Sequence, residues 1–133
     1  MVTIRVTTGI DTCWQYEDKT GVLIFGDIVG YQYMQSCLTE ACESDANVHL
    51  DRIKACGTSM QCVILRPASY PPKKPRMRLF ERIIFKHDEP EMELIICGNR
   101  PAYRQLVDHV GWLISNSADD LDQHVHVDDT PPG

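Results

Sequence analysis

Two histidines near the end of the chain are spaced so that they could bind a metal ion. His124 and His126 are separated by one residue, and Asp128 follows at the same interval. On an extended strand, side chains two residues apart point to the same face. Two imidazole nitrogens and a carboxylate oxygen would then converge, and Zn²⁺ accepts all three. The spacing permits a site for zinc or another divalent metal, either in a binding module or in a metal-dependent hydrolase.

The same stretch also fits a structural role. If residues 122–128 form a strand, Val125 and Val127 face the core and the histidines face away from it. A His-x-Asp pair occurs in each half of the chain, and a catalytic pair is not expected twice in one small domain. A histidine beside a carboxylate forms a hydrogen-bonded pair that raises the imidazole pKa. This interpretation predicts two structural polar pairs: His49 with Asp51, and His126 with Asp128.

Other catalytic signatures are missing. The chain has none of the short motifs of serine hydrolases, P-loop nucleotide enzymes, zinc proteases or dinucleotide-binding enzymes. None of its six cysteines forms a C-x-x-C pair, so they are predicted to be reduced thiols that pack as small apolar groups. The sequence leaves the question of an enzyme open but leans against it, and it offers no catalytic residue.

The elements that would position these residues come in two similar sets. GVLIFGD, GYQYMQSCLTEAC and NVHLD in the first half match MELIICGN, AYRQLVDHVGWLI and HVHVDD in the second. Gly26 and Gly98 are 72 residues apart, as are Tyr31 and Tyr103. The match predicts a duplicated unit whose halves are related by an approximate two-fold axis.

Each unit is expected to contain a hairpin, a helix and a strand. Apolar residues recur at helical spacing over 34–42 and 103–114. Residues 2–6 with 13–17, and 78–87 with 92–98, are expected to form hairpins, the second with a tight turn at 88–91. We therefore predict an α+β fold with two helices on a mainly antiparallel sheet. The single domain 1–133 would consist of halves 1–66 and 77–129, joined by a basic, proline-rich linker at 67–76.

Charge is distributed unevenly along the chain. The net charge is −6, yet residues 66–86 carry seven Lys or Arg and one acid, whereas residues 87–133 carry ten acids and two Arg. A nucleic-acid-binding domain is usually basic overall, so the acidic balance favours a protein partner.

No signal peptide or apolar segment of about 20 residues is present, which predicts a cytoplasmic protein without membrane contact.

The second half resembles small bacterial immunity proteins of polymorphic toxin systems. The residues that carry the resemblance are a strand-ending glycine, three apolar helix positions and the terminal motif: Gly98, Leu106, Val110, Leu113, His124, His126 and Asp128. The resemblance implies a rigid scaffold without catalytic residues that inhibits a toxin by binding it. For a basic toxin, an acidic face would speed capture; the candidates are Asp119, Asp120, Asp122, Asp128 and Asp129.

Three functions therefore remain open. The leading one is a non-enzymatic protein-binding domain, with an immunity-like inhibitor as its narrower form. The second is the metal site at His124, His126 and Asp128. The third is a self-associating scaffold, because an edge strand such as residues 2–6 could pair across a homodimer axis.

Overall fold

The computed structural model describes residues 2–6, 22–50, 54–56, 60–68, 74–116 and 124–127. These residues contain two helices, α1 (Ile28–Glu43) and α2 (Arg100–Asn116). The strands, in chain order, are β1 (Val2–Val6), β2 (Val22–Gly26), β3 (Val48–Leu50), β4 (Lys54–Cys56), β5 (Met60–Pro67), β6 (Met77–Lys86), β7 (Glu89–Gly98) and β8 (His124–Val127).

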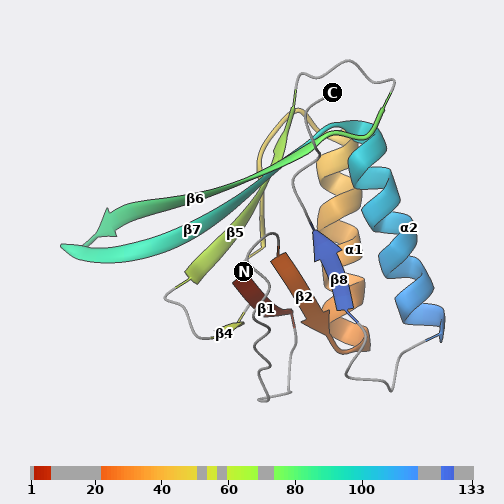
Figure 1. Ribbon diagram of the computed structural model, residues 1–133, viewed down its shortest axis with the longest axis horizontal. Helices are drawn as coiled ribbons and strands as arrows, with labels where there is room; N and C mark the ends of the chain where they lie inside the picture. Colours follow the sequence, from red (N-terminus) through yellow and green to blue (C-terminus); the bar gives the residue numbers. More distant parts are fainter. Residues whose placement is uncertain are drawn as a thin grey trace.

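The strands form two sheets, ordered β4-β1-β2-β8 and β3-β5-β7-β6 (Figure 1). Of the six pairs between described strands, four are antiparallel, whereas β1 with β2 and β5 with β7 are parallel. Each sheet draws strands from both halves of the chain, since β8 pairs with β2 in the first sheet and β5 pairs with β7 in the second. The predicted α+β class and the mainly antiparallel pairing are confirmed.

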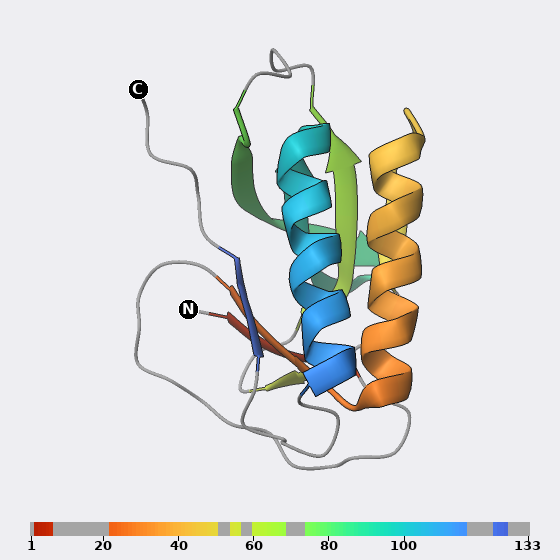
Figure 2. The same cartoon turned by 90° about the vertical axis from the view of Figure 1, so that its right-hand side faces the viewer.

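The two helices run side by side in opposite directions and cover the same side of the strands (Figure 2). The Gln35 side-chain amide on α1 donates a hydrogen bond to the Val107 carbonyl oxygen on α2 at 3.3 Å. Gly111 permits this close approach, because a Cβ at that position would lie only 2.9 Å from Gln35 Nε2. Neither of these two helices is long and apolar enough to cross a membrane.

One hydrophobic core lies between the helices and both sheets. The apolar residues predicted to line the first helix are buried, as are Tyr103, Val110 and Leu113 of the second. They pack in one cluster with strand residues from both sheets, including Ile24, Val63, Leu65, Leu94, Ile96 and Val125. The helical periodicity therefore predicted the inward faces correctly.

Both helices begin in the same way, directly after the inner strands β2 and β7. The Asp27 carboxylate accepts a hydrogen bond from the Gly30 N–H at 2.6 Å. The Asn99 side-chain oxygen accepts one from the Ala102 N–H at 3.2 Å. Such N-caps satisfy backbone donors that have no partner inside the helix. The two caps are 72 residues apart, the spacing of the expected repeat; the duplication itself stays a prediction.

The strand pairing differs from the prediction in two places. β1 does not form a hairpin with the strand that leads into α1; it pairs in parallel with β2, and residues 13–17 lie outside the described residues. Because β4 occupies its other side, β1 is an inner strand, and the prediction that residues 2–6 form an edge strand is wrong. The hairpin before α2 is confirmed, but its tight turn is at His87 and Asp88 rather than at 88–91. Pro90 belongs to β7, near the end of the hairpin, where a missing N–H is tolerated.

Candidate functional site

The histidines of the terminal motif lie on β8, which is an edge strand of its sheet among the described strands. Val125 and Val127 are almost fully buried, so the predicted inward face of this strand is confirmed. Backbone alternation assigns the positions of His124 and His126 to the opposite face. The core therefore holds this strand through its valines.

The acidic members of the predicted sites lie outside the described residues. This applies to the predicted partner face and to both carboxylates of the polar pairs: Asp51, Asp119, Asp120, Asp122, Asp128 and Asp129. His49 is described and is exposed on β3. Within the described part of the chain, no group of three His, Cys, Asp or Glu residues is placed to hold a metal ion.

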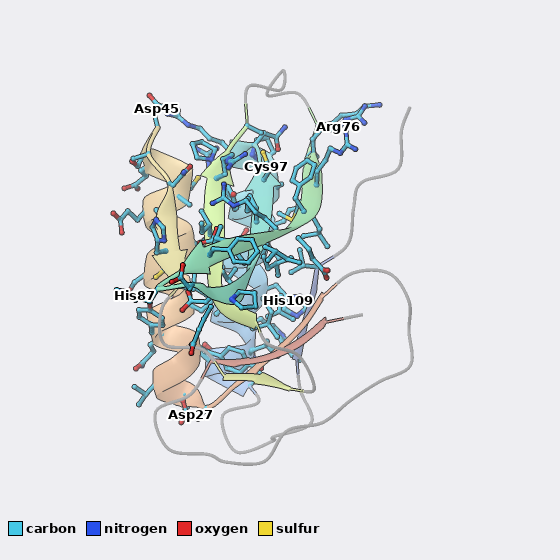
Figure 3. All side chains as sticks on the ribbon, turned by 90° about the vertical axis from the view of Figure 1, so that its left-hand side faces the viewer. Asp27, Asp45, Arg76, His87, Cys97 and His109 are labelled. Carbon is cyan, nitrogen blue, oxygen red and sulfur yellow. The ribbon has the colours of Figure 1, made fainter. Side chains whose placement is uncertain are left out.

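The hairpin formed by β6 and β7 extends beyond the rest of its sheet. β5 pairs with β7 only as far as Met92. Beyond that point β6 and β7 pair only with each other among the described strands, through Ile84 with Glu91, Phe85 with Pro90, and Lys86 with Glu89. We call residues 83–92 the arm. Figure 1 shows the arm projecting beyond the helices, and Figure 3 views the molecule from the side of its tip.

One face of the arm is apolar and uncovered. Ile83 and Phe85 stand on the same face of the hairpin as Leu94 and Ile96, because Leu94 pairs with Glu81 and strand side chains alternate. Leu94 and Ile96 are buried in the core, whereas Ile83 is 59% exposed and Phe85 is 76% exposed. The face of the hairpin that packs against the core at Leu94 and Ile96 is therefore exposed to solvent at Ile83 and Phe85, where the helices do not cover it.

The opposite face of the hairpin carries a cationic row on β6. The Arg82 guanidinium donates a hydrogen bond from Nε to Glu93 Oε1 on β7 at 2.9 Å. The Arg78 guanidinium lies 5.5 Å from the centre of the Phe80 ring, within the range of a cation–π contact. Phe80 itself is 42% exposed. The two arginines therefore share this face with Phe80 and Ile84, whereas Glu81, Ile83 and Phe85 stand on the opposite face of β6.

The turn at the tip has a backbone typical of tight hairpins. His87 has φ 51° and Asp88 has φ 64°, so both central residues lie in the left-handed region. A two-residue turn of this type matches the natural twist of paired strands. The arm is consequently a continuous two-stranded ribbon up to its last residue pair.

A pocket lies where the end of α1 meets the beginning of α2. Its lining combines two arginines with two acids and three other residues: Thr39, Cys42, Glu43, Arg100, Arg104, Val107 and Asp108. The Cys42 thiol at its wall donates a weak hydrogen bond to the Arg100 carbonyl oxygen at 3.8 Å. The balanced charges of this pocket indicate no single class of ligand.

Two titratable groups, Tyr103 on α2 and Cys97 on β7, have raised pKa values. Burial raises the pKa of the Tyr103 hydroxyl, and its hydrogen bond with the Gly98 backbone opposes this in part. Burial also raises the pKa of the Cys97 thiol, against the opposing charges of Arg66 and Arg78. Both groups are held in their neutral forms at pH 7, whereas a reactive cysteine needs a lowered pKa. Neither group has the properties of a nucleophile.

Sequence reasoning missed the exposed residues of the arm. The run Ile83-Ile84-Phe85 was interpreted as part of an ordinary strand within the predicted sheet. The sequence carries no local signal of this exposure, because a run of three apolar residues also occurs in strands that are buried on both faces. Comparisons of the chain with family models, curated proteins and solved structures found no match.

Proposed function

We propose that this chain is a non-enzymatic protein-binding domain and that the arm is its main contact. The observation that carries the proposal is the exposure of Ile83 and Phe85 on a face that is continuous with the core. Single exposed apolar residues are normal on a protein surface, whereas grouped ones mark interaction sites. Large aromatic side chains such as Phe85 also provide much of the apolar area in protein interfaces.

The proposal is tested by removing the apolar face while keeping the hairpin. The double variant Ile83→Ser/Phe85→Ser and the control variant Trp112→Ser are each used to capture proteins from native cells. Trp112 is a matched control because it is 56% exposed but lies on α2, away from the arm. We expect a partner that the wild type and the control retain and the arm variant loses. Equal capture by all three proteins would contradict the proposal.

A narrower form of this function is an immunity-like inhibitor of a basic toxin. The support is compositional: residues 87–133 hold ten acids and two arginines. An acidic surface raises the association rate with a basic partner, and this effect weakens with salt. The association rate constant should therefore fall steeply between low and physiological ionic strength, and a salt-independent rate would remove this form of the proposal.

A further inference from the structure

We propose, on the basis of the arm's role as the contact, that the outer edge of β6 from Arg78 to Phe85 accepts an extended acidic segment of the partner as an additional strand. β6 is the last strand of its sheet among the described residues, and β7 occupies its inner edge. An edge strand directs every second N–H and C=O away from its neighbour, which is a template for strand addition.

The side chains of β6 indicate which segment fits. An added strand would place its alternate residues beside Glu81, Ile83 and Phe85 on one face, and beside Arg78, Phe80, Arg82 and Ile84 on the other. Apolar residues suit the positions beside Ile83 and Phe85, and carboxylates suit those beside Arg78 and Arg82. The inferred ligand is therefore a segment in which acidic and apolar residues alternate.

The strand that pairs with the inner edge of β6, which is β7, already has this alternation of acidic and apolar residues. β7 begins with Glu89, Glu91 and Glu93 alternating with apolar residues, in the stretch EPEMEL. Arg82 pairs across the strands with Glu93 through Nε and Nη2. Within the described chain, Nη1 of Arg82 makes no hydrogen bond, and the side chain is 48% exposed. Arg82 can therefore meet a second carboxylate on the outer side of β6.

Arg78 adds a second cationic position to the same row. It is exposed and lies over the Phe80 ring, and no described carboxylate is within ion-pair distance of it. The two guanidiniums are four residues apart on one strand, a separation of roughly 13 Å. Carboxylates at positions i and i+4 of an added strand match this spacing.

The charges also argue against a second copy of the chain as the occupant. Two β6 edges related by a two-fold axis would pair antiparallel, with the Arg78–Arg82 row of one beside the same row of the other. Like charges that face each other across strands are destabilising. A partner with carboxylates at these positions avoids this repulsion and gains two cross-strand pairs.

The test uses a capped synthetic peptide of sequence EVEVEVE, with KVKVKVK as its charge-reversed control. Binding to the isotope-labelled full chain is followed by amide chemical shifts and by hydrogen exchange. We expect the glutamate peptide to shift and protect backbone amides of residues 80–85, and to bind about tenfold more tightly than the lysine peptide. A fully N-methylated glutamate peptide, which cannot donate backbone hydrogen bonds, should not bind.

Charge reversal on the protein completes the test. Arg78→Glu should weaken the preference for the glutamate peptide, because only Arg82 of the row then remains, whereas Arg104→Glu on α2 should leave the preference unchanged. Equal binding of both peptides, or binding of the N-methylated peptide, would overturn strand addition. If no peptide binds but Ile83→Ser/Phe85→Ser still abolishes partner capture, strand addition fails and the protein-binding function stands. If the peptide binds but the arm is dispensable for capture, the proposed function fails instead.

Discussion

At the scale of single residues, Tyr103 connects the helix layer to a parallel pair of strands. Its hydroxyl oxygen lies 2.6 Å from the Arg66 carbonyl oxygen on β5 and 2.8 Å from the Ile96 carbonyl oxygen on β7. It also accepts a hydrogen bond from the Gly98 N–H at 3.2 Å. One buried hydroxyl thus fixes where α2 meets both strands.

Replacing Tyr103 with phenylalanine should destabilise the fold. The substitution leaves buried backbone groups without their partner, which costs about 1–3 kcal/mol. Chemical denaturation measures the change in the free energy of unfolding, with the exposed Trp112→Phe as a control that should change it by less than about 0.5 kcal/mol. An unchanged midpoint in Tyr103→Phe would show that the hydroxyl is not needed.

The raised pKa of Tyr103 predicts a loss of stability at alkaline pH. Below about pH 10 the hydroxyl is protonated in both the folded and the unfolded chain, so its contribution is complete. Above that pH the unfolded chain releases the proton more readily, because burial raises the pKa in the folded state. The difference in unfolding free energy between the wild type and Tyr103→Phe should therefore narrow above about pH 10. A constant difference up to pH 11 would contradict this account.

The histidines of β8 are predicted to contribute little to stability. Val125 is 1% exposed and holds the strand in the core, so Val125→Ala should cost about 1–3 kcal/mol. His124→Ala and His126→Ala should each change the free energy of unfolding by less than about 0.5 kcal/mol.

Elemental analysis of untagged protein should find no stoichiometric metal. One metal ion per chain that is lost in either histidine variant would favour the metal site instead.

At the scale of elements, the arm depends on a turn whose second residue is not the preferred one. Asp and His adopt a left-handed backbone more readily than most residues do, but glycine adopts it at no steric cost and the pair Asn-Gly is the most favoured in such turns. His87→Asn/Asp88→Gly should therefore stabilise the arm by about 1 kcal/mol. Hydrogen exchange at residues 83–92 should slow, while the core amides of β5 serve as an internal control. Faster exchange in the arm would show that the native turn residues make contacts that stabilise it.

Two glycines should respond differently to the same substitution. A Cβ at Gly98 would lie 3.2 Å from the Tyr103 ring, which is held by its hydrogen bonds, so Gly98→Ala should destabilise the protein by about 1–3 kcal/mol. In Gly111→Ala the new Cβ meets the movable end of Gln35. The gain in helix propensity should then leave stability unchanged or raise it by up to about 1 kcal/mol. Thermal denaturation of both variants compares them, and equal losses would contradict the packing described for Gly98.

The elements were predictable from the sequence to different degrees. Both helices were, because their apolar residues recur at one local period over about two to three turns, at 34–42 and 103–114. The parallel pairing of β1 with β2 and the position of β8 beside β2 were not, because strand order depends on contacts between distant residues. The apolar run at the tip of β6 gives the same local signal whether it is buried or exposed. The arm could therefore be recognised only once the position of the helices was known.

At the scale of the whole molecule, a packed body supports a projecting hairpin. Both sheets and both helices share a single core, and among the described elements the hairpin of β6 and β7 extends beyond it (Figure 1). This arrangement anchors the ribbon through Leu94 and Ile96 while its tip remains accessible. Since an isolated two-stranded hairpin is marginally stable in water, such anchoring allows the arm to present its apolar face in a fixed orientation.

The most direct test of the central claim is site-specific photo-cross-linking in native cells. Benzoylphenylalanine is placed at position 85 on the arm or, in a separate variant, at position 112 on α2, since Phe85 and Trp112 are both exposed aromatic residues. We expect a discrete adduct with another protein from position 85 and none from position 112. No adduct at position 85, or the same adducts from both positions, would contradict the claim that the arm is the binding contact.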